Sequence, residues 1–366
     1  MAGSFGGEHA RTREKDNFVT PKKSTSQTVT SFDGFSIAVV IPCYNEGQSI
    51  ARVVQEFAAA LPEARIFVYD NNSTDDTVAK AEAAGAVVRS EPRQGKGFVV
   101  RRMFADIEAD ILVMVDGDNT YEAARAPVLV RKLINEGLDM VVGARAETKE
   151  AGAYRPGHKF GNAMLTGFVR TLFGHGFQDM LSGYRVFSRR FVKSFPATST
   201  GFEIETELTV HALDLEMPCA EVQTAFQDRE EGSESKLRTF SDGFRILWTI
   251  AKLLKRERPV RLFAALASLS MLIAIWLSLP ILFTYFETGL VPRFPTLIVA
   301  TGFGTVAILA VAVGLILDTV TTGRREIKRL SYLAVPGVLA QLEKAGQPKP
   351  NLPGASAKVL HSRGLH

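Results

Sequence analysis

Short apolar runs alternate with segments of helical spacing from residue 37 to about residue 143. The runs lie at 37–41, 66–69, 86–88, 111–115 and 140–142. Continuous runs rich in β-branched residues that alternate with helices are typical of a parallel sheet covered on both faces. We therefore predict an α/β domain with a mostly parallel sheet and helices on both of its faces.

The pattern weakens after residue 143 but still predicts further elements of the same domain. Two helices and two strands are expected, at 158–173, 203–215, 184–187 and 219–226. We place the α/β domain at 34–240. It follows a flexible polar tail at 1–33, which lacks the apolar segment of a secretory signal.

Two apolar segments without charge lie near the C-terminus, at 262–286 and 294–317. A helix of roughly 20 apolar residues spans the hydrocarbon core of a bilayer. Buried helices of soluble proteins seldom avoid charge over such a length, which disfavours two core helices. We therefore predict a transmembrane hairpin at 262–317, followed by a C-terminal tail at 318–366.

Residues 241–261 precede the hairpin and combine an apolar face that includes Trp248 with basic residues elsewhere around the helix. This composition is typical of an amphipathic helix that lies in the membrane interface. An ordinary surface helix packed on the domain is the alternative.

Basic residues gather at the outer flanks of the hairpin, whereas the link between the two spans carries one acid and one base. By the positive-inside rule, the α/β domain and both termini are predicted on the cytoplasmic side of the inner membrane. A channel or transporter is disfavoured, because it needs more spans with ionisable groups inside them. The flanks contain Lys252, Lys255, Arg256, Arg258 and Arg261 before the hairpin and Arg324, Arg325, Lys328 and Arg329 after it.

The formal net charge of +4 is small for 366 residues, so no nucleic-acid partner is indicated. Cys43 and Cys219 are the only cysteines, and neither has His or Cys neighbours at metal-ligand spacing. Neither a disulfide framework nor a zinc site is therefore expected.

Acidic side chains follow two of the predicted strands. Asp116 and Asp118 come directly after the run at 111–115, and Asp70 follows the run at 66–69. The carboxyl ends of parallel strands meet in one crevice. Two carboxylates so close together repel each other unless a cation is near, and a hard divalent cation is the usual solution. The alternative is that Asp116 and Asp118 belong to a surface turn or a helix cap.

Seven short motifs, in order, resemble those of family 2 glycosyltransferases with the GT-A fold, which is a Rossmann-like α/β fold. The last three resemble the branch that glycosylates polyprenyl phosphates, which includes dolichyl-phosphate mannose synthases and bacterial undecaprenyl-phosphate glucosyltransferases. The similarity covers about residues 36–240, and the hairpin is similar to that of the anchored bacterial members. The motifs are Ile41-Pro42-Cys43-Tyr44-Asn45-Glu46, the segment 70–77, Gly95-Lys96-Gly97, Asp116-Gly117-Asp118, and the segments 179–185, 201–205 and 229–237.

The resemblance implies a site for a nucleotide-sugar donor, with UDP-sugars favoured over GDP-sugars, and a Mg²⁺ or Mn²⁺ cofactor held by Asp116 and Asp118. Several relatives have a metal-binding Gln at the position of Thr120, so the third protein ligand is left open. Asn71 stands where many relatives have a second Asp. Glu203 is a further candidate for contact with the donor sugar. The donor pocket would be lined by Pro42, Asn45, Glu46, Asp70 and Lys96.

The resemblance also implies a site for the phosphate of a polyprenyl lipid. Arg145 matches an arginine that contacts this phosphate, and Asp179 matches an acidic residue near the reacting centre. Arg145 and Asp179 are therefore predicted to be catalytic, together with Asp116 and Asp118. Other basic positions around the two phosphate groups are matched by Lys159, Arg229 and Lys236.

We predict transfer of a hexose-type sugar to a polyprenyl phosphate, with undecaprenyl phosphate favoured, for envelope glycan synthesis or modification. A phosphate monoester has a second pKa of about 6, so it attacks as a dianion without a strong general base. We expect an inverting single displacement in which the metal offsets the charge gained by the diphosphate leaving group. Formation of a homo-oligomer is left open.

Two other functions are weighed against this prediction. A processive polysaccharide synthase would need more spans and a Gln-x-x-Arg-Trp motif, which neither Trp248 nor Trp276 provides. A non-catalytic membrane protein that binds nucleotide-sugars is disfavoured by the intact Asp116, Asp118 and Arg145.

Overall fold

The structure is a computed structural model. It describes residues 34–146, 177–201, 203–226 and 258–344, together with the single positions 32, 167, 255 and 346. Several predicted segments lie wholly or largely outside the described residues: the tail at 1–33, the helix at 158–173, the motif at 229–237 and the interfacial helix at 241–261.

Within the described residues, seven strands form one sheet in the order β3-β2-β1-β4-β6-β5-β7. β6 runs antiparallel to both of its neighbours, and all the other pairs are parallel. The predicted mostly parallel sheet is therefore confirmed. The strands are β1 Ile37–Cys43, β2 Arg65–Asp70, β3 Val87–Ser90, β4 Ile111–Met114, β5 Met140–Arg145, β6 Arg185–Ser188 and β7 Cys219–Thr224.

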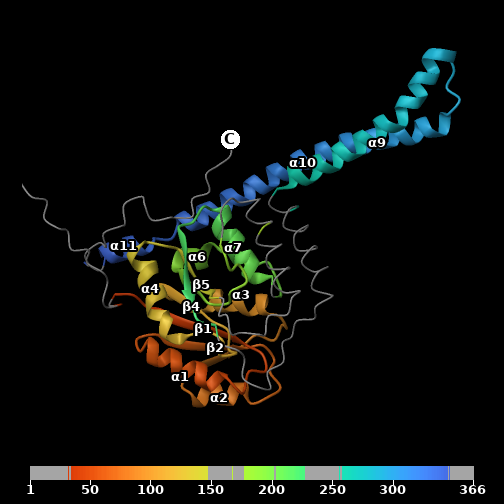
Figure 1. Cartoon of the computed structure of the whole chain (residues 1–366). Helices are drawn as coiled ribbons and strands as arrows, with labels where there is room; N and C mark the ends of the chain where they lie inside the picture. Colours follow the sequence, from red (N-terminus) through yellow and green to blue (C-terminus); the bar gives the residue numbers. More distant parts are fainter. Residues whose placement is uncertain are drawn as a thin grey trace, which may run out of the picture.

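Helices cover both faces of the sheet, as predicted (Figure 1). Successive side chains of a strand point to opposite faces, so Val39 and Ile41 pack into one core while Ala38 and Val40 pack into the other. The first core also receives α1 Ile50–Ala60, α2 Thr77–Ala83 and α4 Ala126–Asn135, with the short 3₁₀ helix η1 Ala123–Arg125. The second core receives α3 Lys96–Asp106, α6 Arg189–Ser194 and α7 Ile204–Asp214.

The strand register brings the sites expected from the sequence to one edge of the sheet. Cys43 at the end of β1 pairs with Asp70 at the end of β2. Met114 at the end of β4 pairs with Val40 of β1 in the same direction. β5 and β7 also run parallel to each other, and β5 ends at Arg145. The loops after these strands therefore meet at the carboxyl edge.

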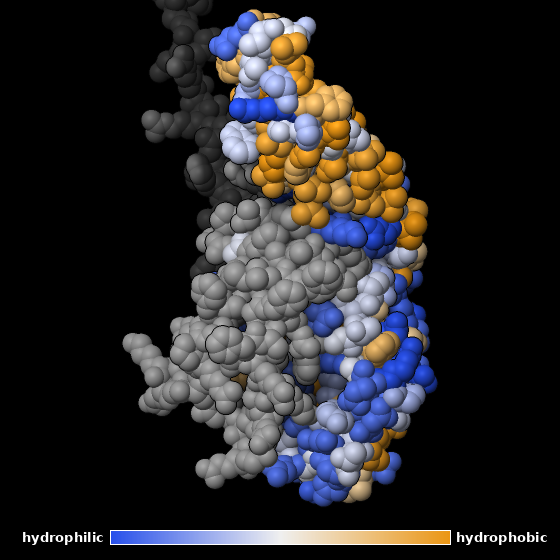
Figure 2. Space-filling view, turned by 90° about the vertical axis from the view of Figure 1, so that its right-hand side faces the viewer, coloured by the Kyte–Doolittle hydropathy of each residue, from blue (hydrophilic) through white to orange (hydrophobic). Residues whose placement is uncertain are grey.

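Two long helices, α9 Pro259–Thr288 and α10 Phe294–Leu333, pack along each other and project from the domain as a hairpin (Figure 1). By length and composition, each is able to cross a membrane. Large apolar side chains such as Trp276 are exposed, at 71%, and Figure 2 shows a hydrophobic area on the hairpin above a mostly hydrophilic domain surface. α10 extends beyond the span predicted at 294–317, and a further helix, α11 Val338–Lys344, follows α10.

Candidate active site

The turn after β4 carries Asp116 and Asp118 at the carboxyl edge of the sheet. Gly117 between them lies so close to β1 that an added Cβ would be 2.7 Å from Cys43 Sγ. The Ser49 hydroxyl donates a hydrogen bond of 2.6 Å to the Gly117 carbonyl oxygen. Only glycine fits this position, so the two carboxylates are held in place by the packing of the turn.

Asp116 contacts a buried lysine that comes from a different part of the chain. Lys96 Nζ lies 2.5 Å from Asp116 Oδ1 and 2.5 Å from Glu205 Oε1. Burial lowers the pKa of the Lys96 ammonium, but the two carboxylates raise it more, so the pKa is raised overall. Lys96 therefore stays a cation beside the acid pair.

Lys96 is placed by the close approach of two backbone segments. It is the first residue of α3, and the preceding Gly95 has a φ of 135°, which favours glycine. A Cβ on Gly95 or Gly97 would overlap the carbonyl oxygens of Thr200 and Ser199. The start of α3 thus packs directly on the segment that leads into α7.

Asn71 holds the loop that leads into α3 and Lys96. Its Nδ2 donates to the carbonyl oxygens of Glu91 at 2.8 Å and Arg93 at 2.7 Å, and its Oδ1 accepts from Gly95 N at 2.7 Å. A carboxylate is unable to make the first two bonds because it has no donor. The departure from the family pattern at Asn71 therefore has a structural role in this chain.

Asn45 and Asp70 organise the loop that follows β2. Asn45 donates from its backbone N to Ser73 Oγ at 2.9 Å, and its Oδ1 accepts from Thr74 N at 2.8 Å. The carboxylate of Asp70 is buried and accepts from Ser73 N at 3.2 Å. The structure thus brings these two predicted donor-site residues together.

Pro42 and Glu46 lie next to this loop. Pro42 is half-buried in β1, in register with Tyr69 of β2. The backbone N of Glu46 donates to Thr77 Oγ1 at 2.9 Å. Both residues are therefore at the carboxyl edge where a nucleotide is expected.

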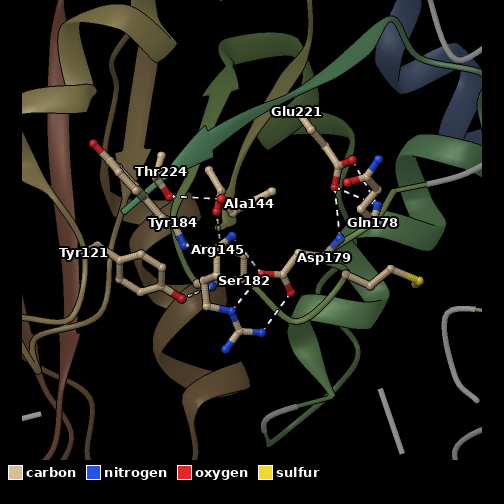
Figure 3. A network of polar contacts seen from close by, with 12 residues as sticks. Tyr121, Ala144, Arg145, Gln178, Asp179, Ser182, Tyr184, Glu221 and Thr224 are labelled. Atoms are coloured by element: carbon tan, nitrogen blue, oxygen red, sulfur yellow. Dashed lines mark hydrogen bonds and ion pairs between the residues drawn. The ribbon is translucent and has the colours of Figure 1, made fainter. Parts of the chain in front are cut away.

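Arg145 and Asp179 form a bidentate pair at the end of β5 (Figure 3). Arg145 Nε lies 2.7 Å from Asp179 Oδ2, and Arg145 Nη2 lies 2.8 Å from Asp179 Oδ1. Glu221 holds the Asp179 loop by accepting from the backbone N of Gln178 and of Asp179. Burial raises the pKa of Asp179, but the hydrogen bonds and charge of Arg145 lower it more, so the pKa lies below its ordinary value.

The Arg145 pair and the acid pair are joined through the segment that leads into β6. A Cβ on Gly183 would overlap Asp116 Oδ2. The backbone N of Gly183 donates to the Tyr121 hydroxyl at 2.9 Å, and the neighbouring Ser182 donates to the Gly143 carbonyl oxygen at 2.6 Å. The residues predicted for the donor and those predicted for the acceptor are therefore connected through Ser182 and Gly183.

Some of the predicted residues are not part of this arrangement. Lys159, Arg229 and Lys236 lie outside the described residues. Glu203 directly precedes α7 and its side chain makes no capping hydrogen bond, whereas the buried Glu205 contacts Lys96. Sequence reasoning missed Glu205, because acids at a helix start are explained by the helix dipole alone. The signal was present, since Glu205 belongs to the motif at 201–205.

The acid pair suits a hard divalent cation. Asp118 Oδ1 accepts from Thr120 Oγ1 at 2.7 Å, so threonine supports the carboxylate where several relatives carry a Gln. The described residues contain no group of three or more His, Cys, Asp or Glu placed to hold a metal. Asp116 and Asp118 therefore fit Mg²⁺ or Mn²⁺ as a pair of oxygen ligands, whose remaining positions would be filled by other oxygens.

Comparison with known proteins agrees with this architecture. Residues 38–195 match the family described as Glycosyl transferase family 2. Glycosyltransferase AglJ of Haloferax volcanii is 34% identical over 245 residues, which cover 67% of this chain and 80% of AglJ. The polyprenol monophosphomannose synthase of Mycolicibacterium smegmatis is 26% identical over 224 residues, which cover 53% of this chain and 78% of that protein.

A solved structure is also similar. It is the glucosyl-3-phosphoglycerate synthase of Mycobacterium tuberculosis in complex with Mn²⁺ and UDP-glucose. The similarity has a TM-score of 0.50 at 26% identity and covers 61% of this chain and 79% of that one. The sheet and its acidic edge thus define a GT-A glycosyltransferase that uses a nucleotide-sugar donor. The chain belongs to glycosyl transferase family 2.

Proposed function

We propose that the enzyme transfers a hexose-type sugar from a UDP-sugar to the phosphate of a polyprenyl lipid, with undecaprenyl phosphate as the favoured acceptor. The observation that carries the proposal is the fusion of a glycosyltransferase domain to two helices of membrane-spanning length. The similarity to a polyprenol monophosphomannose synthase supports a lipid acceptor, and the similarity to a structure with UDP-glucose supports the donor.

The donor would bind with its diphosphate next to Asp116 and Asp118, which would hold Mg²⁺ or Mn²⁺. The cation would offset the negative charge that the diphosphate gains as it leaves. Lys96 contributes a further positive charge at this point, and its contact with Glu205 keeps the ammonium group in place. Pro42, Asn45, Glu46 and Asp70 would surround the nucleotide.

The acceptor phosphate would bind to Arg145, whose guanidinium group suits bidentate contact with a phosphate. One phosphate oxygen attacks the anomeric carbon in line with the departing UDP oxygen, and the configuration inverts. A phosphate dianion has no proton to lose, so no general base is needed. Asp179 fits this scheme because its lowered pKa keeps it a carboxylate that orients Arg145.

The hairpin would anchor the enzyme in the cytoplasmic membrane with the catalytic domain on the cytoplasmic side. Basic residues at both outer ends of the hairpin support this orientation, including Arg258, Arg261, Arg324 and Lys328. A lipid acceptor would then reach the site from the bilayer.

The experiment uses the purified full chain in vesicles that contain undecaprenyl phosphate, with labelled UDP-sugars and GDP-sugars supplied one at a time. We expect a labelled lipid with one UDP-sugar, and no product from Asp118→Asn. Transfer to 3-phosphoglycerate instead of the lipid would contradict the lipid acceptor. Donor binding without any product would favour a non-catalytic sensor.

A further inference from the structure

The length of α10 exceeds what a membrane crossing needs. Its 40 residues correspond to about 60 Å at a rise of about 1.5 Å per residue, whereas the hydrocarbon core is about 30 Å thick. If the hairpin crosses the membrane as proposed, the C-terminal part of α10 lies outside the bilayer. Figure 1 shows this part running along the catalytic domain beside α6 and α7.

A buried aspartate of the domain meets α10 near its C-terminal end. Asp139 directly precedes β5, and its side chain is 0% exposed. It accepts from Tyr332 OH of α10 at 2.8 Å, from Ser188 Oγ at 2.7 Å and from Arg190 Nε at 2.6 Å. The Arg190 guanidinium group also lies 4.5 Å from the centre of the Tyr332 ring. Tyr332 is therefore part of the polar network that neutralises this acid.

A second buried aspartate meets the same face of α10 at a point before Tyr332 in the chain. Asp214 ends α7, and its side chain is 1% exposed. Arg325 Nε lies 2.5 Å from Asp214 Oδ1, and Lys328 Nζ lies 3.2 Å from Asp214 Oδ2. The spacing of three, four and seven residues places Arg325, Lys328 and Tyr332 on one face of α10. A buried acid is costly without its cations, so this face is bound tightly to the domain.

The chain after α10 returns to the core of the catalytic domain. Val338 and Leu342 of α11 are buried in the core that also contains residues of α1 and α4. Gln341 Nε2 donates to Asp110 Oδ1 at 3.0 Å, and an added Cβ at Gly137 would lie 2.8 Å from Leu339 Cδ1. α10 is thus held on the domain by its own polar face and by the segment that follows it.

These attachments lie at the end of the sheet opposite the active site. Asp110 precedes β4, Asp139 precedes β5, and Asp214 ends the helix that leads into β7, so all three are on the side of the amino ends of these strands. Asp116 follows β4 and Arg145 is the last residue of β5, so both lie at carboxyl ends of strands. The attachment therefore holds the domain without covering the edge where the substrates meet.

We infer that Asp139 and Asp214 are positioning residues for the reaction with a membrane-embedded acceptor. They clamp α10 rigidly onto the catalytic domain, and α10 in turn fixes the height and tilt of the active-site edge above the bilayer. This inference rests on the proposed function, because only an acceptor held in the membrane requires a fixed position of the domain. An acceptor that diffuses freely reaches the site in any orientation.

The test changes the three residues of α10 that contact Asp139 and Asp214, which we call the clamp: Arg325, Lys328 and Tyr332. Asp139 keeps its hydrogen bonds with Arg190 and Ser188. The variant Arg325→Gln/Lys328→Gln/Tyr332→Phe is compared with Arg324→Gln/Arg329→Gln, which removes two charges from the same helix and leaves Arg325, Lys328 and Tyr332 in place. Both are assayed as full chains, in vesicles with undecaprenyl phosphate and in detergent with a short-chain prenyl phosphate. We expect the activity of the clamp variant to fall by about tenfold in vesicles and by less than about twofold in detergent. A misplaced catalytic domain affects transfer only to an acceptor that is embedded in the membrane. The control keeps both activities.

A physical measurement accompanies the assay. Ala59→Cys on α1 and Glu326→Cys on α10 are both at exposed positions, whereas the native Cys43 and Cys219 are buried. Spin labels on the two introduced cysteines should give one narrow distance distribution in the parent chain and a broad one in the clamp variant, by pulsed electron paramagnetic resonance.

A broad distribution in the parent chain would overturn the inference, as would equal losses with both acceptors or full activity of a loosened clamp variant in vesicles. If the parent chain glycosylates no lipid phosphate, the proposed function is wrong. The distance distributions would then still decide whether the clamp is rigid.

Discussion

Charged side chains of the site are paired with one another. Lys96 lies between Asp116 and Glu205, and Arg145 binds Asp179 through two hydrogen bonds. The sequence predicted Lys96, Arg145 and Asp179 as site residues but not these pairings, because the partners are far apart along the chain and depend on the strand order.

Asn71 offers a test of how the Lys96 loop is held. In Asn71→Asp, a carboxylate would face the carbonyl oxygens of Glu91 and Arg93 and lose both hydrogen bonds. We expect the free energy of unfolding to fall by about 1–3 kcal/mol, with a lower kcat/KM for the donor. Gln55→Glu is the matched control, because it also turns an amide into a carboxylate, at an exposed position of α1. Equal effects in both variants, measured by thermal unfolding and donor kinetics, would contradict the role of Asn71.

The pH dependence of activity distinguishes protonation of the acceptor phosphate from protonation of Asp179. The pKa of Asp179 is lowered, so the stability it contributes is complete above its ordinary pKa of about 3.9 and is lost only as the pH falls through the lower folded value. The acceptor phosphate instead takes up a proton near its second pKa of about 6. We expect kcat/KM for the lipid to fall below this pH while the protein remains fully folded. Asp179→Asn should lower activity at every pH and leave this acid limb in place. Disappearance of the limb in that variant would show that Asp179 itself titrates there.

The elements show which parts of the fold follow from sequence patterns. β1, β2, β4 and β5 were predicted because continuous apolar runs mark strands that are buried on both faces. The antiparallel direction of β6 was not predictable from its run at 184–187, since an apolar run carries no information on strand direction. The continuity of α10 was not predicted, because the apolar span at 294–317 is followed by a charged segment.

The junction between α3 and the segment before α7 determines where Lys96 lies. In Gly97→Ala, the new Cβ would lie 2.1 Å from the Ser199 carbonyl oxygen, so the two segments must separate. We expect kcat/KM to fall by about tenfold to a hundredfold, because a shift of about 1 Å in a catalytic group has effects of that size. Gly323→Ala in α10 is the control, because its Cβ would meet nothing within 4 Å. Unchanged kinetics in Gly97→Ala would show that the site tolerates displacement of Lys96.

At the scale of the whole molecule, the hairpin interrupts the catalytic domain rather than ending it. The chain leaves the domain before α9, returns along α10 and completes the domain core with α11. The tail predicted at 318–366 therefore includes structural parts of the enzyme. Val338, Leu339 and Leu342 lie at the spacing of one helix face, but this pattern alone does not show which surface the face packs against.

This packing predicts a long-range effect of a single residue on stability. Leu342 is 0% exposed and lies in the core that also contains residues of α1 and α4. Leu342→Ala in the full chain should lower the free energy of unfolding of the catalytic domain by about 2–5 kcal/mol, because the change leaves a cavity in that core. Leu333→Ala should have almost no effect, because Leu333 is 68% exposed. Thermal unfolding followed by circular dichroism, together with loss of glycosyltransferase activity on heating, measures both variants. If the domain of Leu342→Ala unfolded at the parent temperature, α11 would be a peripheral segment, and α10 would be held by the Asp139 and Asp214 contacts alone.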